Sequence, residues 1–155
     1  MTSPPSPDTA RRLLHAARDA ARRAWVPYSH FPVGTAVLTA EDRVISGCNV
    51  ENAAYGEAIC AERNAVTSMV ATTERPEGAA PPAIAAVAVV GLRAAPCWPC
   101  GACRQVLREF HCRYVIVEDA SGEPIIVDFE EILPHSFGPE ALSSAPKNPP
   151  QNQGE

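Results

Sequence analysis

The side chains best suited to chemistry stand in two short stretches of the sequence. The first, AICAERNAV, places Cys60 two positions before Glu62. The second, PCGACRQ, holds Cys100 and Cys103 in a C-x-x-C spacing. Each stretch is predicted to begin a helix, and the amide groups and dipole of a helix N-terminus stabilise thiolates. Two such helix starts brought together over a sheet would converge three thiolates on one point.

Three thiolates are a ligand set for zinc that leaves the fourth tetrahedral position open, which is the arrangement of a catalytic rather than a structural ion. A carboxylate in the first turn of the same helix could take a proton from a water at that position and pass it to a leaving group. This is the role predicted for Glu62. The combination of C-x-E with P-C-x-x-C matches the signature of zinc deaminases.

Other interpretations of the cysteines are open at this stage. A lone C-x-x-C is also typical of redox motifs, and Cys60 alone would more often be a buried packing residue. Cys97 forms a second C-x-x-C with Cys100 and could close the zinc into a non-catalytic four-thiolate site. Against this closure, Pro99 should leave Cys97 back along the loop while Cys103 lies one turn into the helix. Ala58 would be strained if the backbone there required a positive φ.

Hydrophobic periodicity and turn residues predict an α/β fold with helices and strands in the order α-β-β-α-β-α-β-β-α. The expected fold is a three-layer α-β-α sandwich around a mixed five-stranded sheet. Asp8 or Thr9 is expected to cap the first helix. The expected elements are a helix at 9–24, strands at 33–39 and 43–50, a helix at 58–72, a strand at 84–91, a helix starting at 99, strands at 114–119 and 124–129, and a short helix at 130–133.

The 155 residues suit one domain, predicted at 8–143, between disordered proline-rich tails at 1–7 and 144–155. A net charge of −5 argues against nonspecific binding to nucleic acid. The longest apolar run, 79–92, is too short to span a membrane. The N-terminus lacks the apolar region of a secretory signal, and acidic residues interrupt its arginine-rich pattern, which argues against a transit peptide. A cytoplasmic protein, with its six cysteines reduced, is therefore expected.

From about Pro27 to Leu142 the chain resembles the cytidine deaminases of the small homotetrameric class. The motifs that carry the resemblance are PYSHFPVGTAVL, GCNVENAAYGEAICAERNAV, PCGACRQVLREF and ILPHSFGPEAL. The resemblance implies one zinc ion per chain, bound by Cys60, Cys100 and Cys103, with Glu62 as the proton shuttle. It also implies that Arg63 donates hydrogen bonds to thiolate sulfur and so offsets the negative charge of the cluster.

The same resemblance implies a set of substrate contacts. Asn49 and Glu51 would bind the ribose hydroxyls, Phe31 would line the base pocket, and the backbone of Ala61 would hold the pyrimidine edge. Phe137 would stack on the base in a neighbouring subunit's site, and Tyr55 would reach across an interface. From residue type alone, Asn49 and Glu51 would be turn residues and the two phenylalanines would be core residues.

The expected activity is the zinc-dependent hydrolysis of cytidine and deoxycytidine to uridine and deoxyuridine, with release of ammonia, in pyrimidine salvage. The expected assembly is a homotetramer with shared active sites that binds a small nucleoside, not a nucleic acid polymer. Two alternatives remain: a deaminase of another aminopyrimidine nucleoside, of the blasticidin type, and a non-catalytic structural zinc module.

Overall fold

The computed structural model describes residues 3–143, and the expected tail at 144–155 lies outside these described residues. A mixed five-stranded sheet forms the middle of the fold, with strand order β2-β1-β3-β4-β5. Strands β3 and β4 are parallel, and the other neighbouring strands are antiparallel. The strands are β1 (Val33–Thr39), β2 (Val44–Cys48), β3 (Ile84–Gly91), β4 (Tyr114–Glu118) and β5 (Pro124–Asp128).

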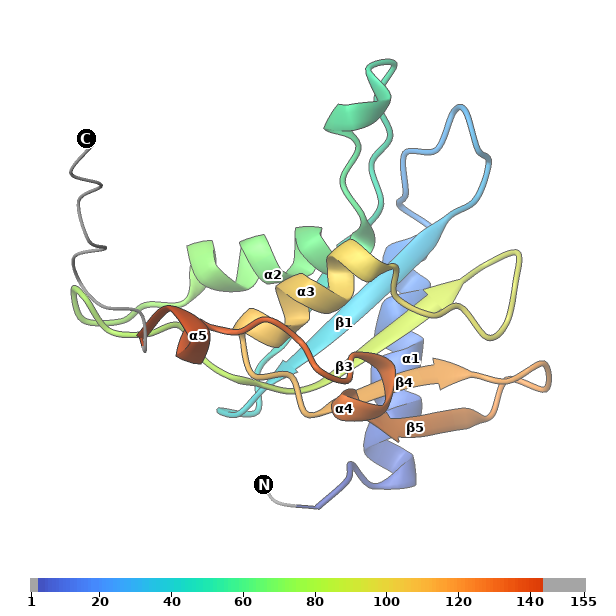
Figure 1. The fold of residues 1–155 in the computed structure, drawn as a ribbon. Coiled ribbons are helices and arrows are strands. Elements are labelled where there is room, and N and C mark those ends of the chain that lie inside the picture. Colours follow the sequence, from blue (N-terminus) through green and yellow to red (C-terminus); the bar gives the residue numbers. More distant parts are fainter. Residues whose placement is uncertain (1–2, 144–155) are drawn as a thin grey trace, which may run out of the picture.

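Helices cover both faces of this sheet (Figure 1). Helix α1 (Pro7–Ala21) packs on one face, and helices α2 (Ala61–Thr72) and α3 (Gly101–Glu109) pack side by side on the other. Side chains alternate between the two faces along a strand. Leu38 of β1 therefore packs with α1, whereas its neighbour Val37 packs with Met69 of α2 and Leu107 of α3. The predicted three-layer α-β-α sandwich is confirmed.

Two glycines allow helices to approach the sheet closely. A Cβ atom added to Gly34 would lie 2.0 Å from the carbonyl oxygen of Ala17 in α1. One added to Gly47 would lie 2.7 Å from the carbonyl oxygen of Ala61 and 2.5 Å from the amide nitrogen of Ala65, both in α2. The first turn of α2 is therefore pressed directly against β2.

The helix starts differ from the expected ones. Helix α1 begins at Pro7, and its N-cap is Ser6, whose hydroxyl accepts from the backbone N–H of Thr9 at 3.2 Å. The expected caps Asp8 and Thr9 were wrong because proline at the first helical position already sets the required φ. This helix also ends at Ala21, short of residue 24.

Helix α2 begins at Ala61, three residues later than expected. Ile59 is extended because it exchanges two backbone hydrogen bonds of 3.0 Å with Val50. The helix can therefore start only after Cys60. Ala58 has a φ of −66°, so the backbone strain considered for alanine at this position is absent.

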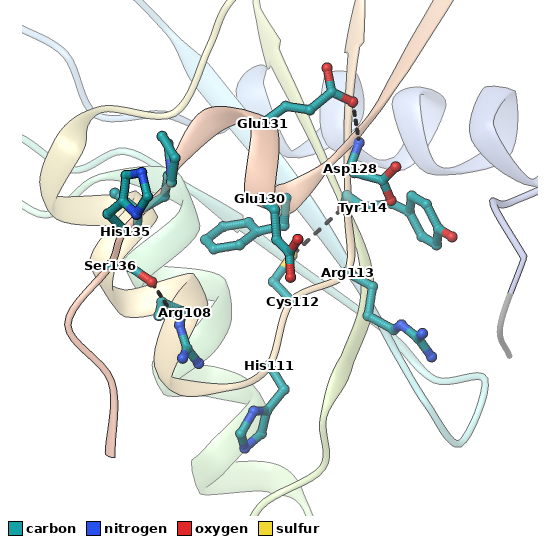
Figure 2. Close-up of a pocket in the computed structure, with 13 residues that line it drawn as sticks. Arg108, His111, Cys112, Arg113, Tyr114, Asp128, Glu130, Glu131, His135 and Ser136 are labelled. Carbon is teal, nitrogen blue, oxygen red and sulfur yellow. Dashed lines mark hydrogen bonds between the residues drawn. The ribbon is translucent and has the colours of Figure 1, made fainter. Parts of the chain in front are cut away.

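The C-terminal part of the described chain runs along α3. It contains the short helices α4 (Phe129–Ile132) and α5 (Pro139–Ser143), of which α5 was not expected. A 3-10 turn, η1 (Tyr55–Glu57), interrupts the loop before α2. A cavity of about 960 Å³ lies between the end of α3, the start of β4 and the segment after α4 (Figure 2). No helix within residues 3–143 combines the length and the apolar character needed to cross a membrane.

Candidate functional site

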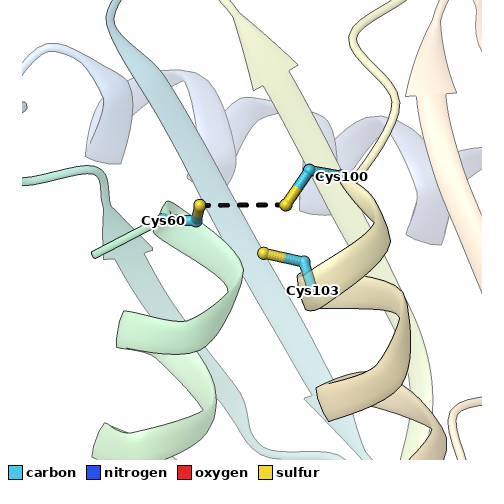
Figure 3. Close-up of side chains that lie close together, drawn as sticks. All are labelled: Cys60, Cys100 and Cys103. Carbon is cyan, nitrogen blue, oxygen red and sulfur yellow. Dashed lines mark hydrogen bonds between the residues drawn. The ribbon is translucent and has the colours of Figure 1, made fainter. Parts of the chain in front are cut away.

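The three predicted metal ligands meet at the N-termini of α2 and α3 (Figure 3). Cys60 is the N-cap residue of α2, Cys100 is the N-cap residue of α3, and Cys103 lies in the first turn of α3. Their sulfur atoms all lie within 4.8 Å of one another, and the Sγ atoms of Cys60 and Cys100 are 4.0 Å apart. The late start of α2 is what places Cys60 at the helix terminus rather than inside the helix.

This cluster has the dimensions of a zinc site. A tetrahedral ion bound at about 2.3 Å from each thiolate holds the sulfur atoms about 3.8 Å apart. The Cys60–Cys100 separation is close to that value. Thiolate sulfur is also a ligand type that favours zinc over hard cations such as magnesium. The residues present therefore fit a zinc ion with three protein ligands.

The electrostatics of the cluster favour ionisation of one sulfur, that of Cys60. A hydrogen bond from the Cys103 thiol, with help from Arg63, lowers the pKa of Cys60 to about 5. The shared proton raises the pKa of Cys103 in turn. Arg63 reaches back over the helix start, where its Nη2 donates to the carbonyl oxygen of Ala58 at 3.0 Å and to Cys60 Sγ at 3.8 Å. Its charge therefore stands beside the sulfur atoms, as the family resemblance implies.

Glu62 is the one carboxylate buried at this helix start, with 4% of its surface exposed. It occupies the second position of α2, between Cys60 and Arg63 in the chain. Burial raises the pKa of Glu62, and the neighbouring Cys60 thiolate raises it further. A carboxyl group with a raised pKa is better suited than an exposed glutamate to take up a proton and pass it on.

Cys97 does not belong to the cluster. No grouping of potential metal ligands within residues 3–143 includes it. Its side chain lies against the end of β3, where a Cβ added to Gly91 would be 3.0 Å from Cys97 Sγ. Burial raises the pKa of Cys97 to about 11, so it remains a neutral thiol. This placement disfavours closure into a four-thiolate structural site.

The predicted ribose-binding residues hold the loop before β1. Asn49 Oδ1 accepts from the backbone N–H of Val33 at 2.8 Å, and its Nδ2 donates to the carbonyl oxygen of Phe31 at 3.0 Å. The carboxylate of Glu51 accepts from the backbone N–H groups of Tyr28 and Ser29, at 2.9 and 3.2 Å. These hydrogen bonds join residues 16 to 23 positions apart, so Asn49 and Glu51 link two distant segments rather than forming a local turn. They bring the segment at 49–51 against the loop that carries Phe31.

Glu51 and Tyr55 line a cavity of about 370 Å³. The ring of Tyr28 meets the ring of Tyr55 edge to face, with 5.8 Å between their centroids. Tyr28, in the motif PYSHF, was not predicted as a site residue. The one signal in the sequence was that Tyr28 stands three positions before Phe31, which was predicted to line the base pocket.

Two of the predicted substrate contacts face solvent in the single chain. Tyr55 is 77% exposed and Phe137 is 60% exposed. Aromatic side chains are enriched at interfaces between proteins. By contrast, Ala61 is fully buried, and its N–H is among the first amides of α2, which have no partner within a helix.

The comparisons with known proteins agree with this geometry. Residues 7–119 match the family described as the cytidine and deoxycytidylate deaminase zinc-binding region. The chain is 38% identical to a cytidine deaminase from Sporosarcina psychrophila, over 86% of this chain and 95% of that protein. It is 36% identical to a cytidine deaminase from Mycobacterium tuberculosis, over 85% and 92% of the two chains.

The fold is also that of a solved relative. The crystal structure of a cytidine deaminase from Burkholderia pseudomallei superposes with a TM-score of 0.70 at 41% identity, over 81% of this chain and 97% of that one. The chain belongs to the cytidine and deoxycytidylate deaminase family, whose matching region binds zinc.

Proposed function

We propose that this protein is a zinc-dependent deaminase that hydrolyses cytidine and deoxycytidine to uridine and deoxyuridine, with release of ammonia, in pyrimidine salvage. The observation that carries the proposal is the buried Glu62 beside three converging thiols, with Cys97 held away from them. The relatives named as cytidine deaminases support the same substrate.

When bound by the three thiolates, zinc supplies an open position at which water is acidified. Glu62 is proposed to accept a proton from the attacking water and to deliver it to N3 of the base. It then moves a proton to the exocyclic amine, which leaves as ammonia. Burial suits Glu62 to this role because a raised pKa lets the carboxyl group hold a transferred proton more readily than an exposed glutamate would.

The substrate contacts are proposed to combine two roles. Asn49 and Glu51 hold the loop that carries Phe31, and their remaining hydrogen-bonding capacity would receive the ribose hydroxyls. The N–H of Ala61, at the start of α2, is proposed to donate to the pyrimidine edge. Arg63 is proposed to moderate the negative charge of the three thiolates.

We further propose a single catalytic domain over residues 8–143 that assembles into a homotetramer with shared active sites. The exposed rings of Tyr55 and Phe137 support this assembly, since each would be covered by a partner subunit. We place the protein in the cytoplasm, which suits unpaired cysteines that must stay reduced.

The test is an assay of cytidine and deoxycytidine deamination by the purified protein, monitored by the release of ammonia. Zinc per chain is measured on the same sample. Turnover with about one zinc per chain is expected. The Glu62→Gln variant, with zinc retained and turnover lost, is the matched control. Turnover of blasticidin-type nucleosides without turnover of cytidine would change the substrate. Full zinc with no turnover of any aminopyrimidine nucleoside would indicate a structural zinc module.

A further inference from the structure

Helix α3 holds the segment that carries Phe137. Gln105 Nε2 donates to the carbonyl oxygen of Phe137 at 3.0 Å. Arg108 Nε donates to Ser136 Oγ at 2.9 Å, as Figure 2 shows, and its Nη2 forms an ion pair with Glu140. These contacts join positions 28 to 32 residues apart in the chain, and they engage the residues on both sides of Phe137.

Gly138 allows the segment that carries Phe137 to pack closely against α3. A Cβ added to Gly138 would lie 2.6 Å from Arg108 Nη2 and 2.4 Å from the carboxylate of Glu140. The ion pair therefore closes over Gly138, where any larger residue would push the pair aside. The backbone around Phe137 is thus fixed by α3, whereas the ring itself is 60% exposed.

The helix that holds this segment is also the helix that carries two of the thiols. Arg104 connects the two regions, because its Nε donates to the carbonyl oxygen of Pro99 at 2.9 Å and its Nη1 donates to that of Ile132 at 2.7 Å. Pro99 directly precedes Cys100 in the chain. The start of α3 and the segment that carries Phe137 are therefore parts of one hydrogen-bonded unit.

We propose that Gln105 and Arg108 are positioning residues that fix the backbone of Phe137 so that its ring is presented to the active site of a partner subunit. This inference rests on the proposed function, in which Phe137 stacks on the base in that site. We call the contacts of Gln105 and Arg108 with residues 136–140 the tether. A fixed backbone lowers the entropy lost when the ring is ordered against a ligand, so the tether should strengthen nucleoside binding. The deamination step itself should be little affected.

The first experiment compares the kinetics of Arg108→Met and Gln105→Leu with those of the zinc-loaded wild type. Arg108→Met removes a hydrogen bond and an ion pair, and should raise KM for cytidine about ten-fold. Gln105→Leu removes one exposed hydrogen bond and should raise KM about three-fold. The kcat value should change by less than about two-fold in both variants. Arg108→Lys keeps the charge opposite Glu140 and should recover part of the loss.

Arg75→Met is the matched control. Arg75 also holds a loop through backbone carbonyls, those of Val70 and Ala79, at 2.9 and 3.2 Å. It lies beyond the opposite end of α2 from Cys60, so its loss should leave KM unchanged. Equal effects of Arg75→Met and Arg108→Met would overturn the positioning role. So would dissociation of the oligomer by Arg108→Met, measured by light scattering.

A double-mutant cycle tests whether the tether acts through the ring of Phe137. In a Phe137→Ala background, Arg108→Met and Gln105→Leu should each change KM by less than about two-fold, because the ring that they position is already absent. Effects as large as those in the wild-type background would show that these residues act by another route and would overturn the inference.

Hydrogen–deuterium exchange separates the tether from the proposed activity. Peptides covering 134–142 should exchange faster in Arg108→Met than in wild type, whereas peptides from β3 should not change. Unchanged exchange at 134–142 would overturn the tether, whatever the enzyme turns over. Faster exchange in a protein whose wild type does not deaminate cytidine would instead overturn the proposed function, and with it the role of Phe137.

Discussion

The metal-binding and substrate-binding regions of this molecule are built in different ways. The thiols and Glu62 lie at two helix starts that pack on the same sheet face, and Glu62 is only 4% exposed. Apart from Ala61 at the start of α2, the residues proposed to contact the nucleoside lie outside the long helices. Two of them, Tyr55 and Phe137, are more than half exposed. One chain therefore supplies all the residues of the first region, whereas the second exposes aromatic rings that the proposed homotetramer would cover.

This difference separates chemistry from recognition. Helix termini pressed against a sheet hold ligand atoms in fixed positions, which suits a metal site. Loops held by a few side-chain hydrogen bonds adapt more readily to a substrate or a partner. Substitutions in the metal-binding region should therefore change zinc content or kcat, and substitutions in the substrate-binding region should mainly change KM.

The largest effect is expected from Cys103→Ser. Cys103 is fully buried and its sulfur lies within 4.8 Å of the other two, and serine is a poor substitute for a soft thiolate ligand. The variant should lose zinc and have no measurable turnover, and its melting temperature should no longer rise on addition of zinc. The metal content of the purified protein, together with thermal unfolding, provides the measurement.

Cys112→Ser is the control for this change. Cys112 is also buried, but it lies at the far end of α3 and its thiol donates to the carbonyl oxygen of Tyr114 at 3.6 Å. Serine can make the same hydrogen bond, so zinc and turnover should remain. Full zinc in Cys103→Ser would mean that the metal is bound elsewhere, and the comparison of the two regions would fail.

The next largest effect is expected from Glu62→Gln. Glutamine has the shape of glutamate but cannot carry a proton between water and leaving group, so kcat should fall about 10³-fold. Zinc content should remain at one ion per chain because Glu62 is not among the three ligands. A variant that kept most of its turnover would assign the proton transfer to another group.

A smaller effect is expected from Asn49→Ala. The change removes two hydrogen bonds that hold the loop at Phe31 and Val33, as well as the proposed ribose contact. It should raise KM about ten-fold and lower the free energy of unfolding by about 1–2 kcal/mol, with zinc retained. Kinetics and denaturant unfolding on the same samples measure the two effects.

Asn64→Ala separates binding from stability. Asn64 Nδ2 also donates to a backbone carbonyl, that of Cys48 at 3.0 Å, but no substrate contact is proposed for it. It should lower stability by about 1 kcal/mol and leave KM unchanged. If both asparagine variants raised KM equally, loop stability alone would explain the effect.

The metal-binding region was easier to predict from the sequence because its signals are local. The site residues belong to two short motifs, one with Cys60 and Glu62 and one with the C-x-x-C, and each motif stands at a predicted helix start. The strands of the sheet are equally local signals, because they are short runs rich in β-branched residues. The start of α1 was also readable, since Ser6-Pro7 is a cap followed by proline. Because residues 1–7 are proline-rich, the predicted start of the helix, at residue 9, was two residues too late.

The remaining features depend on contacts between distant residues. Pairing of Ile59 with Val50 delays the start of α2, and no local pattern in the helix sequence records that pairing. The hydrogen bond from Gln105 to the Phe137 carbonyl joins residues 32 positions apart. Such contacts follow from the packing of finished elements, so a single sequence predicts the residue types but not their partners.

The smallest effect is expected from Cys97→Ala, which tests the boundary of the metal site itself. The Cys97 thiol packs against Gly91 and is absent from the cluster, so zinc content and turnover should match the wild type. Its pKa of about 11, raised from 9.0 by burial, keeps the thiol protonated at pH 8. Iodoacetamide should therefore modify Cys97 of the zinc-loaded protein slowly at pH 8 and faster as the pH rises toward 11, because the thiolate is the reactive form. Peptide mass analysis would follow the modification. Loss of zinc from the Cys97→Ala variant would contradict this prediction, because it would show that Cys97 is a fourth zinc ligand and that the site is structural.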